Sequence, residues 1–372
     1  MRRGYDGSEV FRGSLKRSVF YGQVFDAIFE AHDLSKETGY VRDKKTNLHY
    51  DEFYRALRAL ASLFRQRKVI EVTVRDFLEM ASHITTKTCP DLNFRAEDFL
   101  DDVTHAVPLF TKEGDYVRWS HKSLQDYFLA EFLIRDFTKS KAEALAGMAF
   151  GKDSISNENF LVLVYESDPM LFNEAVTLPA VKEMRERRQY LEKELPKSIA
   201  RDKRTHMRDV LSAYEFFFIK DCKSRNLDVF SHFEEQAETC GLATENMHPR
   251  VAYEFSPSGM GMIVLSHKAM SALSVPLSTG SVKKTGFFSI AGHYKKKSLF
   301  NHEDQFETSS LCRSRLQDGN WALAEEQFDY CMGQLRTSGL SIPDFSDLES
   351  IEKSLEKVIN AARSARSEDI FT

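Results

Sequence analysis

The stretch WSHKSLQDYFLAEFLIRDF, which runs from Trp119 to Phe137, constrains the fold of this chain more than any other. Just before and at its start, Val117 and Trp119 alternate with Tyr116 and Arg118, which is the pattern of a half-buried β-strand. Ser120 is the predicted N-cap of the helix that follows. Apolar side chains then occupy almost every side of that helix: Leu124, Tyr127, Phe128, Leu129, Phe132, Leu133, Ile134 and Phe137. Because a helix that is apolar all round is normally buried, we expect a strand that leads directly into a central helix.

Amphipathic helices are predicted upstream of this strand. Residues 19–33 form two adjacent stripes at i, i+4 and i+8, which indicate a helix with an aromatic face. Asp51 is the predicted cap of a second helix, and Thr73 starts a third, with Asp76 as a variant of the capping box. The inward residues of the second helix are predicted to be Phe53, Leu57, Leu60, Ala61 and Phe64.

A hairpin is predicted to close this N-terminal region. Residues 98–107 form a fourth predicted helix, followed by a strand at Leu109 and Phe110 and by a turn over residues 112–115. The second strand of the hairpin leads into the central helix. Residues 19–138 are therefore predicted to form a helical and winged-helix-like module, preceded by a basic segment over residues 1–18.

Two pieces of this module resemble NACHT-type signalling NTPases of the STAND class. The first is the pattern Phe/Trp-x-His-x-Ser-x-Gln-Glu/Asp-Tyr-Phe, which closes their winged-helix region and which this chain matches from Trp119 to Phe128. The second is FYGQVFDAIFEAHD followed by YDEFYRALRALASLF, which is similar to the helices that follow the ATPase core in bacterial members. The pieces occur in the expected order and cover roughly a third of the chain.

The resemblance implies a role for His121. In the family, the histidine at this position contacts bound ADP and helps to hold the closed, inactive state. An imidazole donates readily to a phosphate oxygen, and a helix N-terminus favours an anion. The simpler alternative is that His121 merely lies in the first turn of a helix. The resemblance also implies a regulatory module that restrains or transmits the nucleotide state of an ATPase core, in bacteria often in defence against phage.

The sequence contains no phosphate-binding loop of its own. The nearest stretch, from Ala146 to Asp153, has Ala in place of the first glycine and Asp in place of the hydroxyl that holds magnesium. ADP or ATP is therefore expected only if an ATPase core or another protein subunit is the partner. We expect the chain to correspond to the post-ATPase portion of such a protein; a truncated gene, a separate subunit and a misassigned start all remain open.

The remaining 139–372 region is predicted to be mainly helical. A helical domain is predicted over 139–248, a β-containing insertion or structured loop over 249–300, and C-terminal helices over 301–372. Residues 159–165 form either a buried strand or a helix. Residues 181–208, which Pro196 interrupts, form either two solvated helices or a helical stalk. Residues 210–219 are interpreted as a core helix. The predicted fold class is mainly α, with a helical bundle, a winged-helix-like hairpin and a small β element.

Composition argues against several classes of protein. The chain has 372 residues, a formal net charge of -5 and five widely spaced cysteines without a Cys-x-x-Cys pair, so a zinc ribbon or a disulfide framework is not expected. No apolar run is long enough for a membrane helix. We expect a cytoplasmic protein with no membrane partner and no metal. No catalytic constellation stands out, so the chain is not expected to be an enzyme, although an effector activity in the C-terminal half remains an alternative.

A nucleic-acid-binding protein is the main alternative. Basic and aromatic residues interleave over 283–297, as on a surface for single strands, and residues 185–208 are rich in Arg and Lys. The candidate contacts are Lys283, Lys284, Lys295, Lys296 and Lys297. A solvated basic loop explains the first segment more simply, and interspersed glutamates favour a self-paired helix surface for the second. The helix before the hairpin carries Glu97, Asp98, Asp101 and Asp102, which disfavours DNA reading by the winged-helix-like module.

Overall fold

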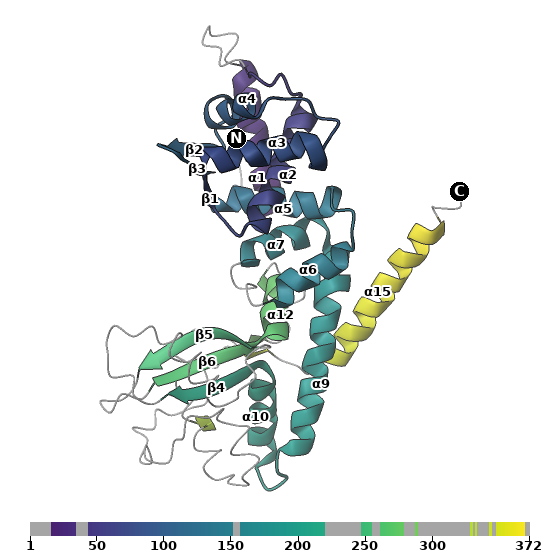
Figure 1. Cartoon of the computed structure of the whole chain (residues 1–372). Coiled ribbons are helices and arrows are strands. Elements are labelled where there is room, and N and C mark those ends of the chain that lie inside the picture. Colours follow the sequence, from purple (N-terminus) through teal and green to yellow (C-terminus); the bar gives the residue numbers. More distant parts are fainter. Residues whose placement is uncertain are drawn as a thin grey trace, which may run out of the picture. The chain divides into compact units, whose positions relative to one another are not determined.

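The computed structural model describes residues 16–34, 44–151, 157–219, 247–254, 261–278, 287–288, 328–329, 332, 342–343 and 347–368 (Figure 1). The described chain is mainly α-helical with small antiparallel sheets, as predicted. It divides into two compact units. The first comprises residues 1–141 and 159–169, and the second comprises residues 142–158 and 170–372.

The first unit is a set of helices around one small sheet. Its elements are, in order, α1 (Arg17–Leu34), α2 (Tyr50–Gln66), β1 (Glu71–Thr73), α3 (Val74–His83), α4 (Ala96–Asp101), β2 (Phe110–Glu113), β3 (Tyr116–Trp119), α5 (Lys122–Arg135) and α7 (Glu158–Ser167). Two π-helical turns, Ile84–Thr88 and Asp102–Ala106, extend α3 and α4. The predicted fourth helix is therefore an α-helix of two short turns that continues as a π-turn.

The sheet of this unit has the order β1-β3-β2, with both pairs antiparallel. Val117 and Trp119 are buried while Tyr116 and Arg118 are exposed, as the alternation predicted. The predicted turn is also present, and Gly114 adopts a φ of +59°, a conformation that favours glycine. Strand β1 was not predicted, because three residues are too few to show a period.

Helix α5 is the buried element that its sequence predicted. Nine of its residues are buried, and its closest partner is α2. Phe128 is fully buried and contacts rings from α1, α2 and β3: Phe25 at 5.6 Å, Tyr54 at 5.5 Å and Trp119 at 5.6 Å between centroids. All five residues predicted to face inward from α2 are buried as well.

Two helices are capped by a histidine and not by the residue that was predicted to cap them. The N-cap of α2 is His49, not Asp51, and its backbone N–H donates to the Glu52 carboxylate at 2.9 Å. The N-cap of α5 is His121, not Ser120. Thr73 caps α3 as predicted, because its Oγ1 accepts from the Asp76 N–H at 3.1 Å. At α5 the error arose because Ser is a common cap, whereas imidazole Nδ1 accepts the same bond in rarer cases.

The second unit joins helices to a three-stranded sheet. Its elements are α6 (Lys141–Phe150), which begins at the last residue of the first unit, then α8 (Pro169–Phe172), α9 (Leu178–Glu194), α10 (Arg201–Ala213), β4 (Tyr214–Ile219), β5 (Met247–Glu254), β6 (Gly261–His267), α12 (Lys268–Ser278), β7 (Phe287–Phe288), β8 (Ile342–Pro343) and α15 (Leu348–Glu368). The sheet order is β4-β6-β5, all antiparallel, and β7 pairs with β8.

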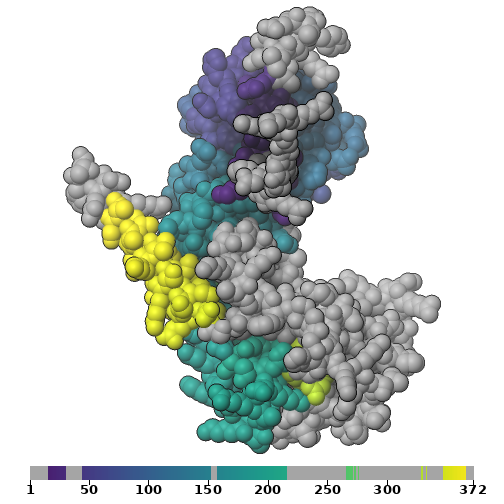
Figure 2. All heavy atoms as spheres, turned by 180° about the vertical axis from the view of Figure 1, so that it is seen from behind, coloured from purple at the N-terminus to yellow at the C-terminus, as the bar shows by residue number. Residues whose placement is uncertain are grey.

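Helix α15 packs on α9 in this unit. Figure 2 shows α15 as the yellow helix beside the teal atoms of the preceding helices. Two ion pairs join the helices, Arg185 with Glu352 at 2.9 Å and Lys182 with Glu356 at 2.7 Å. Among the apolar side chains of α15, Leu348 and Ile359 are buried, whereas Val358 is 48% exposed.

Three further predictions are tested by the secondary structure. Residues 159–165 lie in helix α7, and Pro196 separates α9 from α10 as predicted. Residues 210–219 are not one helix, because α10 ends at Ala213 and Tyr214 starts β4. The aromatic run that suggested a core helix suits a strand equally well, since β-propensity is high for aromatic residues. Of the C-terminal helices predicted over 301–372, α15 is described, whereas residues 301–327 lie outside the described residues.

None of the described helices is both long enough and apolar enough to cross a membrane. Within the described residues there is also no group of three or more His, Cys, Asp or Glu side chains arranged to hold a metal ion.

Candidate functional site

His121, the residue to which the resemblance gives a role, is exposed at the start of α5. Its backbone is extended, with φ of -147°, and its Nδ1 accepts a hydrogen bond from the Ser123 N–H at 3.2 Å. A ring nitrogen that accepts a hydrogen bond carries no proton, so the ring proton of His121 lies on Nε2. The geometry therefore gives His121 a structural task as a cap and also leaves an exposed N–H donor.

A hollow of about 350 Å³ lies next to this helix start. Its lining comes from α1, α5 and α7: Arg17, Phe20, Tyr21, Ser123 and Asn159. Ser123 lies two residues after His121, in the first turn of α5, where backbone N–H groups lack helical partners. The guanidinium of Arg17, the Ser123 hydroxyl and the positive end of the helix together make this hollow favourable for an anion.

A hydrogen-bonded chain of side chains lies along one side of the hollow. Arg17 Nη1 donates to Asn159 Oδ1 at 3.2 Å, and Asn159 Nδ2 donates to Asp126 Oδ2 at 3.1 Å. Asp126 is buried, and this desolvation raises the pKa of its carboxyl, while the bond from Asn159 and the charge of Lys122 oppose the rise. Gln125, also buried, donates to the Val69 carbonyl at 3.4 Å. Both side chains therefore have polar neighbours.

We expect Asp126→Asn to stabilise the protein at neutral pH. Because the folded state raises the pKa of Asp126, it binds the proton more tightly than the unfolded chain does, and stability falls as pH rises from the ordinary value of 3.8 through the raised one. The asparagine has no charge to desolvate, and its oxygen still accepts from Asn159. Urea unfolding between pH 4 and 7 should show a flatter pH profile for the variant. Asp115→Asn, at an exposed position, serves as the control; an identical profile for both variants contradicts the prediction.

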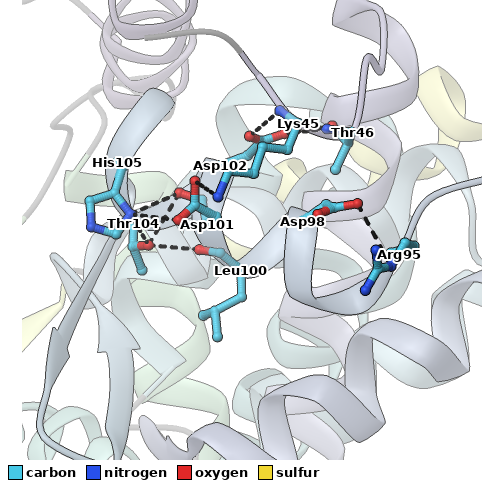
Figure 3. Close-up of polar contacts among 9 residues, drawn as sticks. All are labelled: Lys45, Thr46, Arg95, Asp98, Leu100, Asp101, Asp102, Thr104 and His105. Atoms are coloured by element: carbon cyan, nitrogen blue, oxygen red, sulfur yellow. Dashed lines mark hydrogen bonds and ion pairs between the residues drawn. The ribbon is translucent and has the colours of Figure 1, made fainter.

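The helix that would read DNA in a winged helix carries the predicted carboxylates of Glu97, Asp98 and Asp101, whereas Asp102 is completely buried and does not contribute to the surface charge (Figure 3). Asp98 lies 4.0 Å from Arg95, and Asp101 lies 3.0 Å from the Lys45 ammonium and 3.3 Å from His105. These exposed pairs are weak and leave carboxylates on the surface, which repel a phosphate backbone. Nothing in this geometry favours DNA binding by the module.

The two basic segments give no support to nucleic-acid binding either. Lys283, Lys284, Lys295, Lys296 and Lys297 lie outside the described residues. In the segment 185–208, five of the six arginines form ion pairs within the second unit, and two of the five pair with Glu192, one of the interspersed glutamates. The pairs are Arg185–Glu352, Arg187–Glu215, Arg188–Asp209, Arg204–Glu192 and Arg208–Glu192. Phosphates would have to compete with these carboxylates.

His267 illustrates the histidines of the C-terminal half. It is buried at the end of β6, its Nδ1 accepts from the Ala269 N–H at 3.2 Å, and its Nε2 lies 3.3 Å from Glu183. Both ring nitrogens therefore have a polar neighbour.

Two buried charged residues of the first unit were not predicted from sequence. Arg58 on α2 donates two hydrogen bonds to Asp136 at the end of α5, at 2.6 and 2.9 Å. Asp102 is completely buried after α4. Their partners lie 78 and at least 56 residues away in the chain, so no local pattern could have revealed them. No family model, no curated protein and no solved structure matches this chain.

Proposed function

We propose that this chain is the regulatory module of a NACHT-type signalling NTPase, which restrains or transmits the nucleotide state of an ATPase core carried by a partner. The observation that carries the proposal is the exposed imidazole of His121, whose Nε2–H is free of the capping bond, beside a hollow suited to an anion. Signalling in defence against phage is the setting that the sequence resemblance suggests for such a module.

The chemistry of the site fits a diphosphate. The positive end of α5 stabilises an anion near the first turn, and the neutral Nε2–H donates to a phosphate oxygen without breaking the Nδ1 cap. Lys122, exposed at the first position of the helix, adds a cation. A nucleotide bound to the partner's ATPase core would accept these contacts and so favour docking of that core on the module.

The first test asks whether a Walker-type ATPase is encoded in frame with, or directly beside, the Met1 codon in the source genome. If it is, the two proteins are co-expressed and the ADP retained after purification is measured by ion-pair chromatography. If neither arrangement exists, the proposal is contradicted, because the sensor then has no nucleotide-binding partner.

His121 variants separate nucleotide contact from capping. His121→Ala removes both and should lower the free energy of unfolding by about 1 kcal/mol, whereas Asn is itself a good N-cap, so His121→Asn should keep stability. Both variants should reduce ADP retention by about tenfold, the loss expected for one hydrogen bond to a charged group.

His105→Ala is the matched control, because the His105 side chain is 68% exposed and lies in the same unit. It should leave ADP retention unchanged. If His121→Asn retains as much ADP as the unmodified chain while His121→Ala does not, then His121 acts only as a helix cap and the proposal fails.

A further inference from the structure

A larger hollow lies elsewhere on the first unit, between α3, the start of α4 and the β2–β3 turn. Its volume is about 720 Å³, within the range of about 300–1,000 Å³ typical of binding sites. We call it the acidic groove and define it by six lining residues: Val74, Leu78, Ala96, Glu79, Glu97 and Asp115. None of these residues contributes to the hollow near His121.

The floor and the rim of the acidic groove differ in chemistry. The floor is apolar: Ala96 is buried, and Val74 and Leu78 are half-buried. The rim carries the exposed carboxylates of Glu79, Glu97 and Asp115. An apolar floor with a few charged groups at its edge is the usual composition of a recognition site, because the floor supplies area and the charges fix orientation.

The rim has a net negative charge. Its cation is Arg75, which lies 3.4 Å from Glu79, while Arg95 lies 3.8 Å from Glu97. In the first pair the side chains of Arg75 and Glu79 are 88% and 52% exposed, and in the second pair those of Arg95 and Glu97 are 76% and 62% exposed. Ion pairs as exposed as these contribute little to stability. An incoming cation can therefore take the place of either arginine at small cost. His83 also lines the groove.

We propose that the acidic groove docks a basic segment of a partner protein, which places an apolar side chain on the floor and Lys or Arg side chains against the rim carboxylates. Arginine suits the rim especially, since its guanidinium binds a carboxylate through two hydrogen bonds. The same charge repels nucleic acid. This docking surface requires neither His121 nor a nucleotide, so it stands or falls independently of the function proposed above.

The full chain, with methyl groups of Val, Leu and Ala labelled with carbon-13, provides the test by NMR. The probe is an amphipathic peptide of lysine and leucine, compared with the same peptide in which glutamate replaces every lysine. We expect the lysine peptide to shift the methyl signals of Val74, Leu78 and Ala96, and the glutamate peptide to leave them in place. Shifts confined to other methyl groups, or equal shifts with both peptides, overturn the proposal.

Two variants probe charge and space separately. The triple variant Glu79→Gln, Glu97→Gln and Asp115→Asn should bind the lysine peptide about tenfold more weakly, the sum of three exposed charge contacts. Ser82→Trp fills the groove from an exposed position and keeps every carboxylate; it should also weaken binding.

The control triple Glu30→Gln, Asp51→Asn and Glu71→Gln removes the same charge from exposed positions of the first unit outside the groove. It should leave the affinity within about twofold, since only the screened long-range field changes. Equal losses in the groove and control triples show a general charge effect and overturn the proposal, as does full binding by Ser82→Trp.

Discussion

Replacement of Phe128 by alanine is expected to lower the free energy of unfolding of the first unit by about 4 kcal/mol. The side chain is fully buried, and truncation of a buried phenylalanine loses its transfer free energy and leaves a cavity, together about 3–5 kcal/mol. Its ring contacts with Phe25, Tyr54 and Trp119 are lost as well. Because domains are stable by only about 5–15 kcal/mol, this single change removes a large part of the total.

Trp119 gives a local signal for this measurement, since its ring stacks on Phe128 with centroids 5.6 Å apart. The chain has two tryptophans, so replacement of Trp321 by phenylalanine leaves Trp119 as the reporter of denaturant unfolding. Phe132→Ala is the matched control, because Phe132 lies on the same helix but is only half-buried. It should cost about 1 kcal/mol. Equal losses for the two variants would show that α5 is not the centre of the core.

The sequence predicted the helices of the first unit because their apolar residues repeat at helical spacing over many residues. Phe53, Leu57 and Phe64 are examples, and all three are fully buried. The strand β3 was also predicted, since Val117 and Trp119 alternate clearly with exposed residues. Such periods are local, so they can be read without knowledge of the tertiary structure.

Features that depend on distant partners were not predicted. Strand β1 exists because Val72 pairs with Val117 of β3, and Arg58 is buried because Asp136 neutralises it. At the candidate site, sequence singled out His121 but not its capping bond to Ser123, nor the approach of Arg17 and Asn159. These arrangements arise only when α1, α5 and α7 pack together.

Asp102→Asn is expected to cost the first unit about 3 kcal/mol. The carboxylate is completely buried and accepts three hydrogen bonds: from the Lys45 N–H at 2.7 Å, the Thr46 N–H at 3.0 Å and the Thr46 hydroxyl at 2.6 Å (Figure 3). Oδ1 accepts the first bond and Oδ2 the other two. Because both oxygens accept, an asparagine in either orientation turns its NH₂ group toward a donor. At least one hydrogen bond to a charged acceptor is then lost, and the buried donor is left unpaired. Such a bond is worth about 1.5–3 kcal/mol.

Asp101→Asn provides the control at the neighbouring position, because the Asp101 side chain is 36% exposed and its pair with Lys45 is also exposed. That variant should cost at most about 1 kcal/mol. Hydrogen exchange distinguishes the two mechanisms: the amides of Lys45 and Thr46 should lose protection in Asp102→Asn and keep it in Asp101→Asn. Unchanged protection of both amides in Asp102→Asn would mean that this carboxylate does not hold the segment before α2. The position of this segment matters for the whole module, because α2 is the main packing partner of α5. A displaced start of α2 would move Phe53 and Tyr54 relative to α5, the helix that His121 caps.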